Sequence, residues 1–260
     1  MVPINKLKLT KLQFIISFTQ NTYLPKFIGN TIRGALGQVL YLHYPQVFSY
    51  VFKAKNAESI PNPIAISVPY PSKMRYAQGE TLSFNITLLG TACAFEQDII
   101  NAAKLMCNGK LANAKIIDHQ QIYSLDWSDE GVEHIPICNH LSINFITPTE
   151  ILSSGKPSNT LDFATFIDRA FLRISRVIDS YGESEFTIPY RLIDRKPHVK
   201  TECKLKPVNF HTNKQPIFGV LGQVSFTGNV TRYLPYIDLV SQIHIGKKTS
   251  RGCGQYTFEI

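Results

Sequence analysis

The chain has 260 residues, of which 44% are hydrophobic and 18% are charged. This is the composition of a folded globular protein and excludes a disordered chain. The length allows one large domain or two domains of about 100–150 residues each. The formal net charge of +8 favours an anionic partner, because positive charge steers anions and releases their counterions.

The positive charge is concentrated near the C-terminus. Residues 191–260 contain 11 Lys/Arg and 4 Asp/Glu, a balance of +7, whereas the first 190 residues contain 16 and 15. Clustering of this kind is typical of a nucleic-acid-binding surface. The alternative is that these residues only keep the protein in solution.

The cysteines indicate neither a metal site nor a disulfide framework. Their number is odd and no pair has C-x-x-C spacing, so we expect no metal and no cofactor. Reduced thiols favour a cytoplasmic location. The first ten residues lack the apolar core of a signal peptide, and no run of 18 apolar residues occurs, so we expect no contact with a membrane.

The first half of the chain predicts a β-α-β-β-α-β order of elements. Apolar spacing and proline positions predict, in chain order, a strand at 8–18, a helix at 27–43 limited by Pro45, a loop or edge segment at 60–71, a strand at 81–89, a helix at 95–107 and a strand at 115–125. This order is that of the ferredoxin-like arrangement, which also builds RNA-recognition modules.

The second half predicts the same order. The polar stretch from Trp127 to Pro136 is interpreted as a linker between domains at 1–127 and 136–260. After it, the pattern predicts a strand at 140–146, a helix at 161–181, strands at 200–211 and 217–226, a short helix at 233–241 and a strand at 256–260. The expected fold class is therefore α+β, with two tandem ferredoxin-like (RRM-like) domains that share element order but no alignable repeat.

Two predicted helices carry arginines on the face opposite their apolar stripe. On the long helix at 161–181, Arg169, Arg173 and Arg176 follow i, i+4, i+7 spacing, and a solvated charged face is the commoner explanation. On the helix at 27–43, Arg33 lies next to a glycine. Its side chain can reach a phosphate or pair with a carboxylate, and the sequence leaves both open.

A basic loop flanked by glycines, from Gly246 to Gly254, is the strongest chemical signal. Glycine permits close backbone approach and positive φ, and exposed N–H groups in such a turn form an anion nest. Charged and hydroxyl side chains add donors, at Lys247, Lys248, Thr249, Ser250 and Arg251. The loop matches neither a P-loop nor a dinucleotide fingerprint. We predict that it binds the phosphate backbone of a nucleic acid. A plain basic hairpin is the alternative.

Four stretches in the same order resemble a known family. Residues 244–256 (HIGKKTSRGCGQY) resemble the C-terminal glycine-rich signature of the CRISPR-associated RAMP proteins, and closest of all that of the Cas6 endoribonucleases, which process CRISPR precursor RNA. Residues 24–37, with their Arg-Gly-Ala-Leu-Gly core, resemble the first helix of that branch, and 79–90 and 218–230 resemble two of its strands. In one departure, His244 occupies the place of the first glycine of the signature.

The resemblance implies two ferredoxin-like domains that bind CRISPR repeat RNA, the precursor of crRNA, in antiviral defence, with other CRISPR-associated proteins as further partners. It implies metal-independent cleavage by the 2′-hydroxyl, which leaves a 2′,3′-cyclic phosphate. The residues expected to bind RNA are Arg33, His211, His244, Gly246, Lys247, Lys248, Thr249, Ser250, Arg251, Gly252 and Gly254.

The resemblance also suggests a catalyst. His43 matches the position of the family's catalytic histidine, with Tyr23 before the first helix and Lys53 after it. The alternative for His43 is a histidine favoured at a helix C-terminus by the dipole, and His211 and His244 are weaker candidates. Two other functions stay open: a non-catalytic RNA-binding subunit of a CRISPR effector complex, and a scaffold that binds an acidic protein.

Overall fold

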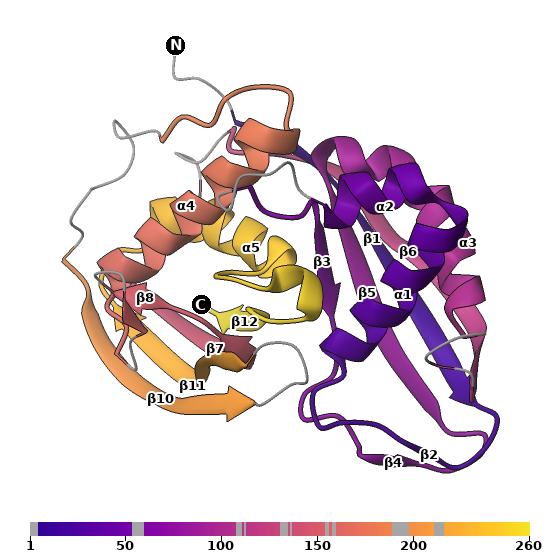
Figure 1. Ribbon diagram of the computed structural model, residues 1–260. Helices are drawn as coiled ribbons and strands as arrows, with labels where there is room; N and C mark the ends of the chain where they lie inside the picture. Colours follow the sequence, from indigo (N-terminus) through magenta and orange to yellow (C-terminus); the bar gives the residue numbers. More distant parts are fainter. Residues whose placement is uncertain are drawn as a thin grey trace.

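The computed structural model describes residues 5–53, 60–107, 111, 113–130, 135, 137–153, 156–157, 160–188, 198–210 and 216–260. Two four-stranded sheets, each with its own helices, stand next to one another (Figure 1). Within these residues, no helix is long and apolar enough to cross a bilayer.

The N-terminal sheet consists of four antiparallel strands in the order β3-β5-β1-β6. Their bounds are β1 (Lys6–Phe18), β3 (Ile64–Ser67), β5 (Thr81–Leu89) and β6 (Ala114–Ser128). One face packs on α1 (Gly29–His43), α2 (Pro45–Phe52) and α3 (Glu96–Met106), with a 3-10 turn, η1 (Gly90–Phe95), before α3. A short ribbon of β2 (Thr22–Tyr23) and β4 (Arg75–Tyr76) extends beyond the sheet.

The C-terminal sheet has the order β10-β11-β7-β12, again antiparallel throughout. Its strands are β7 (His140–Thr149), β10 (Lys200–Phe210), β11 (Ile217–Thr227) and β12 (Tyr256–Glu259), with a small ribbon of β8 (Leu152–Ser153) and β9 (Lys156–Pro157). The helices are α4 (Phe163–Tyr181), α5 (Leu234–Ile243) and the 3-10 turns η3 (Thr231–Tyr233) and η4 (Thr249–Arg251). When the four strands of each sheet are numbered in chain order, both sheets have the order second, third, first, fourth from edge to edge. This shared order confirms two tandem ferredoxin-like units.

Local sequence explains where the main helices begin and end. Asp162 caps α4, because its Oδ1 accepts a hydrogen bond of 2.8 Å from the backbone N–H of Thr165, which satisfies an otherwise unpaired donor. Pro45 ends α1 as predicted, but it also stands at the first position of α2. That second helix was not predicted, because eight residues are too few for the apolar period to be distinct.

The two units share a packed interface. Leu7, Leu9 and Trp127 of the N-terminal unit belong to the same buried cluster as Tyr236 of α5. Asp129 accepts hydrogen bonds from the Asn5 amide (2.6 Å) and from the Tyr236 hydroxyl (2.8 Å). The first residues of the stretch predicted as a linker are thus part of the interface, because Trp127 and Asp129 are each 8% exposed. The domain bounds at 127 and 136 stay a prediction.

His244 forms a second connection between the units. Its backbone has φ 60° and ψ 150°, a region that only glycine adopts without strain. The ring is 1% exposed: Nδ1 lies 3.1 Å from the carbonyl oxygen of Cys253, and Nε2 lies 3.0 Å from Oγ of Ser67 on β3. Since a carbonyl can only accept, Nδ1 carries a proton. Burial keeps the ring neutral because it lowers the pKa of His244 to about 3, so Nε2 accepts from the Ser67 hydroxyl. The ring is therefore neutral and joins the two units.

This buried ring predicts acid sensitivity. Burial lowers the pKa of His244 from its ordinary 6.5 to about 3. Below the ordinary pKa the unfolded chain binds a proton that the folded protein does not, so the stability that this group provides is complete above that pKa and is lost as pH falls. We expect the free energy of unfolding to fall by about 1.4 kcal/mol per pH unit from this residue. Denaturant unfolding at about pH 7 and pH 5 measures it.

The matched variant is His244→Gly, because glycine adopts the same backbone conformation without strain. It should unfold with a shallower dependence on pH than the native protein. The same pH dependence in both proteins would contradict a neutral, buried His244.

Candidate nucleic-acid interface

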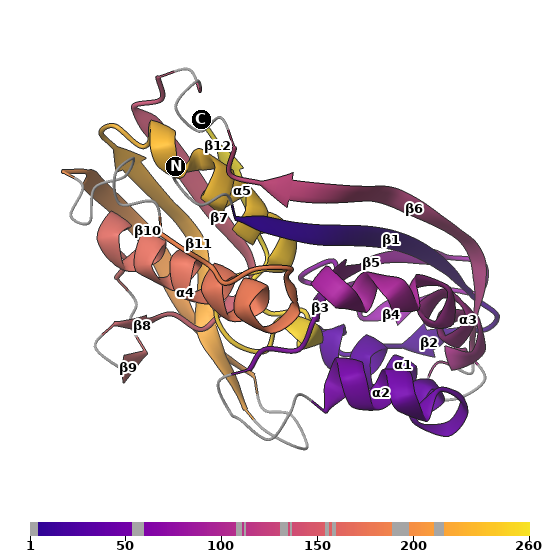
Figure 2. The ribbon, with the colours of Figure 1, turned by 90° about the horizontal axis from the view of Figure 1, so that it is seen from above.

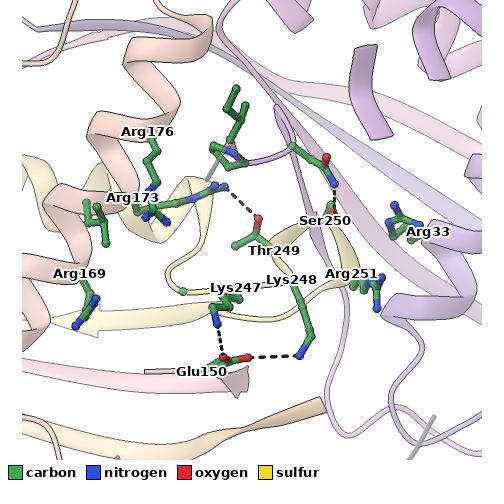
Figure 3. A pocket seen from close by; sticks show the side chains of 15 residues that line it. Arg33, Glu150, Arg169, Arg173, Arg176, Lys247, Lys248, Thr249, Ser250 and Arg251 are labelled. Carbon is green, nitrogen blue, oxygen red and sulfur yellow. Dashed lines mark hydrogen bonds and ion pairs between the residues drawn. The ribbon is translucent and has the colours of Figure 1, made fainter. Parts of the chain in front are cut away.

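A basic cleft lies where α4, the glycine-flanked loop and the N-terminal unit meet (Figure 3). Its cavity measures about 450 Å³. Seven basic side chains and one acidic side chain line it: Arg33, Arg169, Arg173, Arg176, Lys247, Lys248, Arg251 and Glu150. This excess of positive charge in a concave surface suits an anion much larger than a single phosphate.

Close backbone contacts hold the loop in place. At Gly254, with φ 78°, a Cβ atom would lie 1.9 Å from the carbonyl oxygen of Ile245. At Gly29, the first residue of α1, a Cβ atom would lie 1.9 Å from the carbonyl oxygen of Arg251. The loop therefore packs directly on the N-terminus of α1, and only glycine fits at either contact.

Arg173 organises the loop from beneath. It is 6% exposed and its guanidinium donates to the carbonyl oxygens of Ile243 (2.9 Å) and His244 (3.1 Å) and to Oγ1 of Thr249 (3.1 Å). Burial lowers its pKa to about 10, so it stays charged at neutral pH. The expectation of a solvated face is wrong for this arginine, because α4 buries it against the end of α5.

Thr249 and Ser250 support the loop, and each hydroxyl can still donate a hydrogen bond. Each is 5% exposed. The Thr249 hydroxyl accepts from Arg173, and the Ser250 hydroxyl accepts from the amide nitrogen of Asn62 at 3.0 Å. Because a hydroxyl can accept and donate at once, both can still donate a hydrogen bond into the cleft that they line.

The two lysines of the loop share one carboxylate. Lys247 lies 3.0 Å and Lys248 lies 3.4 Å from the carboxylate oxygens of Glu150. The Nζ of Lys248 also lies 3.3 Å from the carbonyl oxygen of Pro216. Among the described residues, Arg251 has no carboxylate within ion-pair distance. Glu150 therefore offsets part of the positive charge of the loop.

Arg33 and Arg169 line the cleft and are not fully hydrogen-bonded within the described part of the protein. The Nε atom of each is buried and has no hydrogen-bond partner among the described residues. The Arg33 guanidinium lies 4.5 Å from the ring centre of Phe52, and burial together with nearby Arg251 lowers its pKa. Of the two alternatives for Arg33, a carboxylate pair is not found in the described part of the chain, and its side chain lines the cleft.

The second half of the predicted nest of backbone N–H groups is used within the protein. The N–H groups of Arg251 and Cys253 donate to the carbonyl oxygen of Lys248, and that of Gly252 donates to Thr249. The N–H of Gly254 donates to Pro148. These four groups are therefore not free to bind an anion, so the second half of the loop can bind one only through its side chains.

The three residues proposed as catalysts do not come together. Tyr23 is 70% exposed on β2, with the Arg75 guanidinium 5.4 Å from its ring centre. His43 is exposed at the C-terminus of α1, a helix of 15 residues that is about 22 Å long. Lys53 is exposed just after α2. No hydrogen bond or ring contact joins these three, all of which the structure describes. Lys53 lines a cavity between α2 and the end of α4.

Of the other two candidate histidines, the structure describes His244 but not His211. The ring of His244 is buried with both nitrogens bonded, so in this structure it has no surface to offer RNA. His211 lies outside the described residues. Sequence reasoning missed Arg169 and Arg176 as part of the cleft, although their spacing with Arg173 on one helix face was the signal.

Two family models match successive parts of the chain. One, described as an N-terminal domain, matches residues 7–135. The other, described as the CRISPR-associated endoribonuclease Cas6, matches residues 143–256 and so includes the glycine-flanked loop. No curated protein sequence matches the chain.

Solved structures share the fold over nearly the whole chain. Cas6 from Thermus thermophilus is 12% identical with a TM-score of 0.65, and 97% of this chain and 99% of that chain are covered. A Cas6 product complex is 13% identical with a TM-score of 0.63, covering 96% and 100%. A partial Cas6-RT-Cas1–Cas2 complex has 13% identity and a TM-score of 0.68, covering 97% of this chain and 46% of that chain.

The match to the Cas6 family model falls on the unit that carries the loop, and the two ferredoxin-like units are those of the solved Cas6 structures. Residues 143–256 are thus similar to the CRISPR-associated endoribonuclease Cas6, and the whole chain has the fold of solved Cas6 structures.

Proposed function

We propose that the chain processes CRISPR precursor RNA by cutting within the repeat. The observation that carries this is the basic cleft, in which seven cationic side chains and one carboxylate surround the loop of the Cas6 family domain. RNA would lie in the cleft through its phosphates, since phosphate contacts provide most of the sequence-independent affinity for nucleic acid.

The names of the structural neighbours support this substrate. Two are Cas6 product complexes, and one is a RAMP protein binding different RNA substrates. Another is a Cas6-RT-Cas1–Cas2 complex. By analogy, we propose repeat RNA as the substrate of this chain and other CRISPR-associated proteins as its partners.

The proposed reaction is attack of a ribose 2′-hydroxyl on the adjacent phosphate, with release of the 5′-oxygen and a 2′,3′-cyclic phosphate. It requires a proton acceptor, a proton donor and positive charge on the phosphate. Lys53 is our candidate for the charge, because Arg33 lies ten residues from His43, about 15 Å along α1. Arg33 and Arg251 can hold neighbouring phosphates. His43 remains our candidate for proton transfer, because it is exposed, whereas the buried ring of His244 has a pKa of about 3 and no free nitrogen.

A non-catalytic RNA-binding subunit is the second candidate. It is favoured by the lack of hydrogen bonds and ring contacts among Tyr23, His43 and Lys53, all of which the structure describes. The two functions differ in one measurement, because only the enzyme yields a product with a cyclic phosphate end.

Removing charge from the loop should weaken RNA binding. For the double variant Lys247→Ala/Arg251→Ala we expect roughly tenfold weaker binding of a random single-stranded RNA at low salt. The plot of log affinity against log salt should become shallower by about 0.7 per lost phosphate contact. Fluorescence anisotropy over a salt series measures both. Lys104→Ala, an exposed lysine on α3, is the control, and equal losses in both proteins would rule out the cleft.

Removing the acidic residue of the cleft should have the opposite effect. Glu150→Gln frees Lys247 and Lys248 from their shared carboxylate and keeps the shape of the side chain. We expect binding to tighten about two- to fivefold at low salt, with a steeper salt dependence by about 0.7. Weaker binding by this variant would mean that Glu150 orders the loop more than it competes with RNA.

Cleavage is tested with the repeat RNA of the protein's own CRISPR array, in the presence of EDTA. We expect cleavage without added metal. His43→Ala should lower the rate by about 10²–10⁴ and leave the affinity unchanged, whereas His140→Ala, another exposed histidine, should do neither. Intact RNA with native protein favours the non-catalytic function, and full activity of His43→Ala places the catalyst elsewhere.

A further inference from the structure

Arg33 carries a positive charge without an oxygen partner. The structure records no hydrogen bond or ion pair between Arg33 and a described residue, and its Nε atom is buried. The two Nη atoms are also without a recorded hydrogen bond, but they are not buried, and the residue lines the basic cleft. The end of the side chain that an anion can reach is therefore the Nη end.

A like charge stands near this side chain. Burial and, to a lesser extent, the charge of Arg251 lower the pKa of Arg33, and both arginines line the cleft (Figure 3). Among the described residues, no carboxylate lies within ion-pair distance of either guanidinium. Repulsion alone would move the Arg33 side chain away from the loop, so an attractive contact is needed to hold it in the cleft.

The ring of Phe52 provides this attractive contact. Its centre lies 4.5 Å from the guanidinium carbon of Arg33, which is within the range of a cation–π interaction. Phe52 is the last residue of α2 and is 9% exposed. In turn, α2 packs beside α1 on the same side of the N-terminal sheet (Figure 2). The ring therefore attracts the guanidinium from within the N-terminal unit and leaves the Nη end to the cleft.

Gly37 makes room for the Phe52 ring. It follows Arg33 by four residues, so both stand on the same face of α1. A Cβ atom at position 37 would lie 3.7 Å from two carbon atoms of the Phe52 ring and 3.8 Å from the ring of Phe48. The two rings are themselves in edge-to-face contact, with centres 6.0 Å apart. In the Arg-Gly-Ala-Leu-Gly core at 33–37, the first residue thus supplies the charge and the last supplies the space for the ring beneath it.

We propose that Phe52 is a positioning residue for Arg33. Its ring holds the guanidinium against the repulsion of Arg251, so that the Nη end already faces the cleft when RNA arrives and binds one phosphate there. A side chain that is ordered beforehand loses less conformational entropy on binding. This proposal rests on the proposed function, because it assumes that RNA lies in the cleft.

A double-mutant cycle tests the coupling between the two side chains. Arg33→Gln should weaken the binding of a random single-stranded RNA at low salt by about three- to tenfold and make the salt dependence shallower by about 0.7. Phe52→Leu should weaken binding by about two- to fivefold when Arg33 is present. In the Arg33→Gln background it should have no effect, because no guanidinium is left to hold. Fluorescence anisotropy measures all four proteins.

Further variants separate positioning from folding, with affinities measured below the lowest Tm of the set. Phe52→Tyr keeps the ring face and should bind RNA as the native protein does. Phe84→Leu removes another core ring of the same unit, stacked on Phe14 at 5.3 Å, over which no cation lies among the described residues. It should lower the Tm without changing the affinity. Phe52→Met refills the space with a flexible apolar chain and replaces Phe52→Leu if leucine unfolds the protein.

The cycle distinguishes positioning from support of the fold. A loss on Phe52→Leu that is equal in both backgrounds overturns the proposal, because a ring that only supports the fold acts regardless of residue 33. Native affinity of Arg33→Gln also overturns it, since Arg33 then binds no phosphate. Failure of the native protein to bind RNA at low salt would instead refute RNA binding by the cleft, and with it the proposed function. A loss confined to proteins with Arg33, and absent from Phe52→Tyr, supports the positioning role.

Discussion

The site depends on a chain of three buried side chains, Arg173, His244 and Ser67. In the part of the chain that the structure describes, Arg173 has no carboxylate partner and bonds to neutral oxygens of α5 and the loop. Such an arrangement costs desolvation energy, and it leaves a positive charge directly beneath the basic cleft. The ring of His244 in turn bonds to Ser67 on β3 and so connects the loop to the other unit. Because of this chain, the loop, the cleft and the domain interface cannot move independently.

His244 stands at a glycine position of the signature. The glycine is lost from the sequence there, but its backbone conformation is retained. The backbone of residue 244 keeps the positive φ that glycine would adopt, and the strain of about 1–3 kcal/mol is offset by two hydrogen bonds and complete burial of the ring. The side chain of His244, which was expected to contact RNA, therefore connects the two units instead. Its neighbours at 246 and 254 remain glycine with positive φ, so the rest of the loop follows the family pattern.

The fold could be predicted closely because both units have strong apolar periods. The strand at 81–89 and the long helix at 161–181 were found almost to the residue, since alternation and 3.6-residue spacing persist for several turns. The site could be predicted only in part. The charges of the loop were evident, but the burial of Arg173 and the pairing of Glu150 with Lys247 depend on contacts between segments about 70–100 residues apart, which no local pattern reports.

The repeated fold itself explains where the cleft lies. α1 and α4 are the first helix of each ferredoxin-like unit, and each contributes arginines to the same cavity: Arg33 from α1, and Arg169, Arg173 and Arg176 from α4. The loop that leads into the last strand of the second unit closes the space between them by packing on Gly29. Neither unit has this surface alone, because each supplies one wall. On the opposite side, the face of the first sheet that lies away from α1, α2 and α3 meets α5 and β12, which line a second cavity with it.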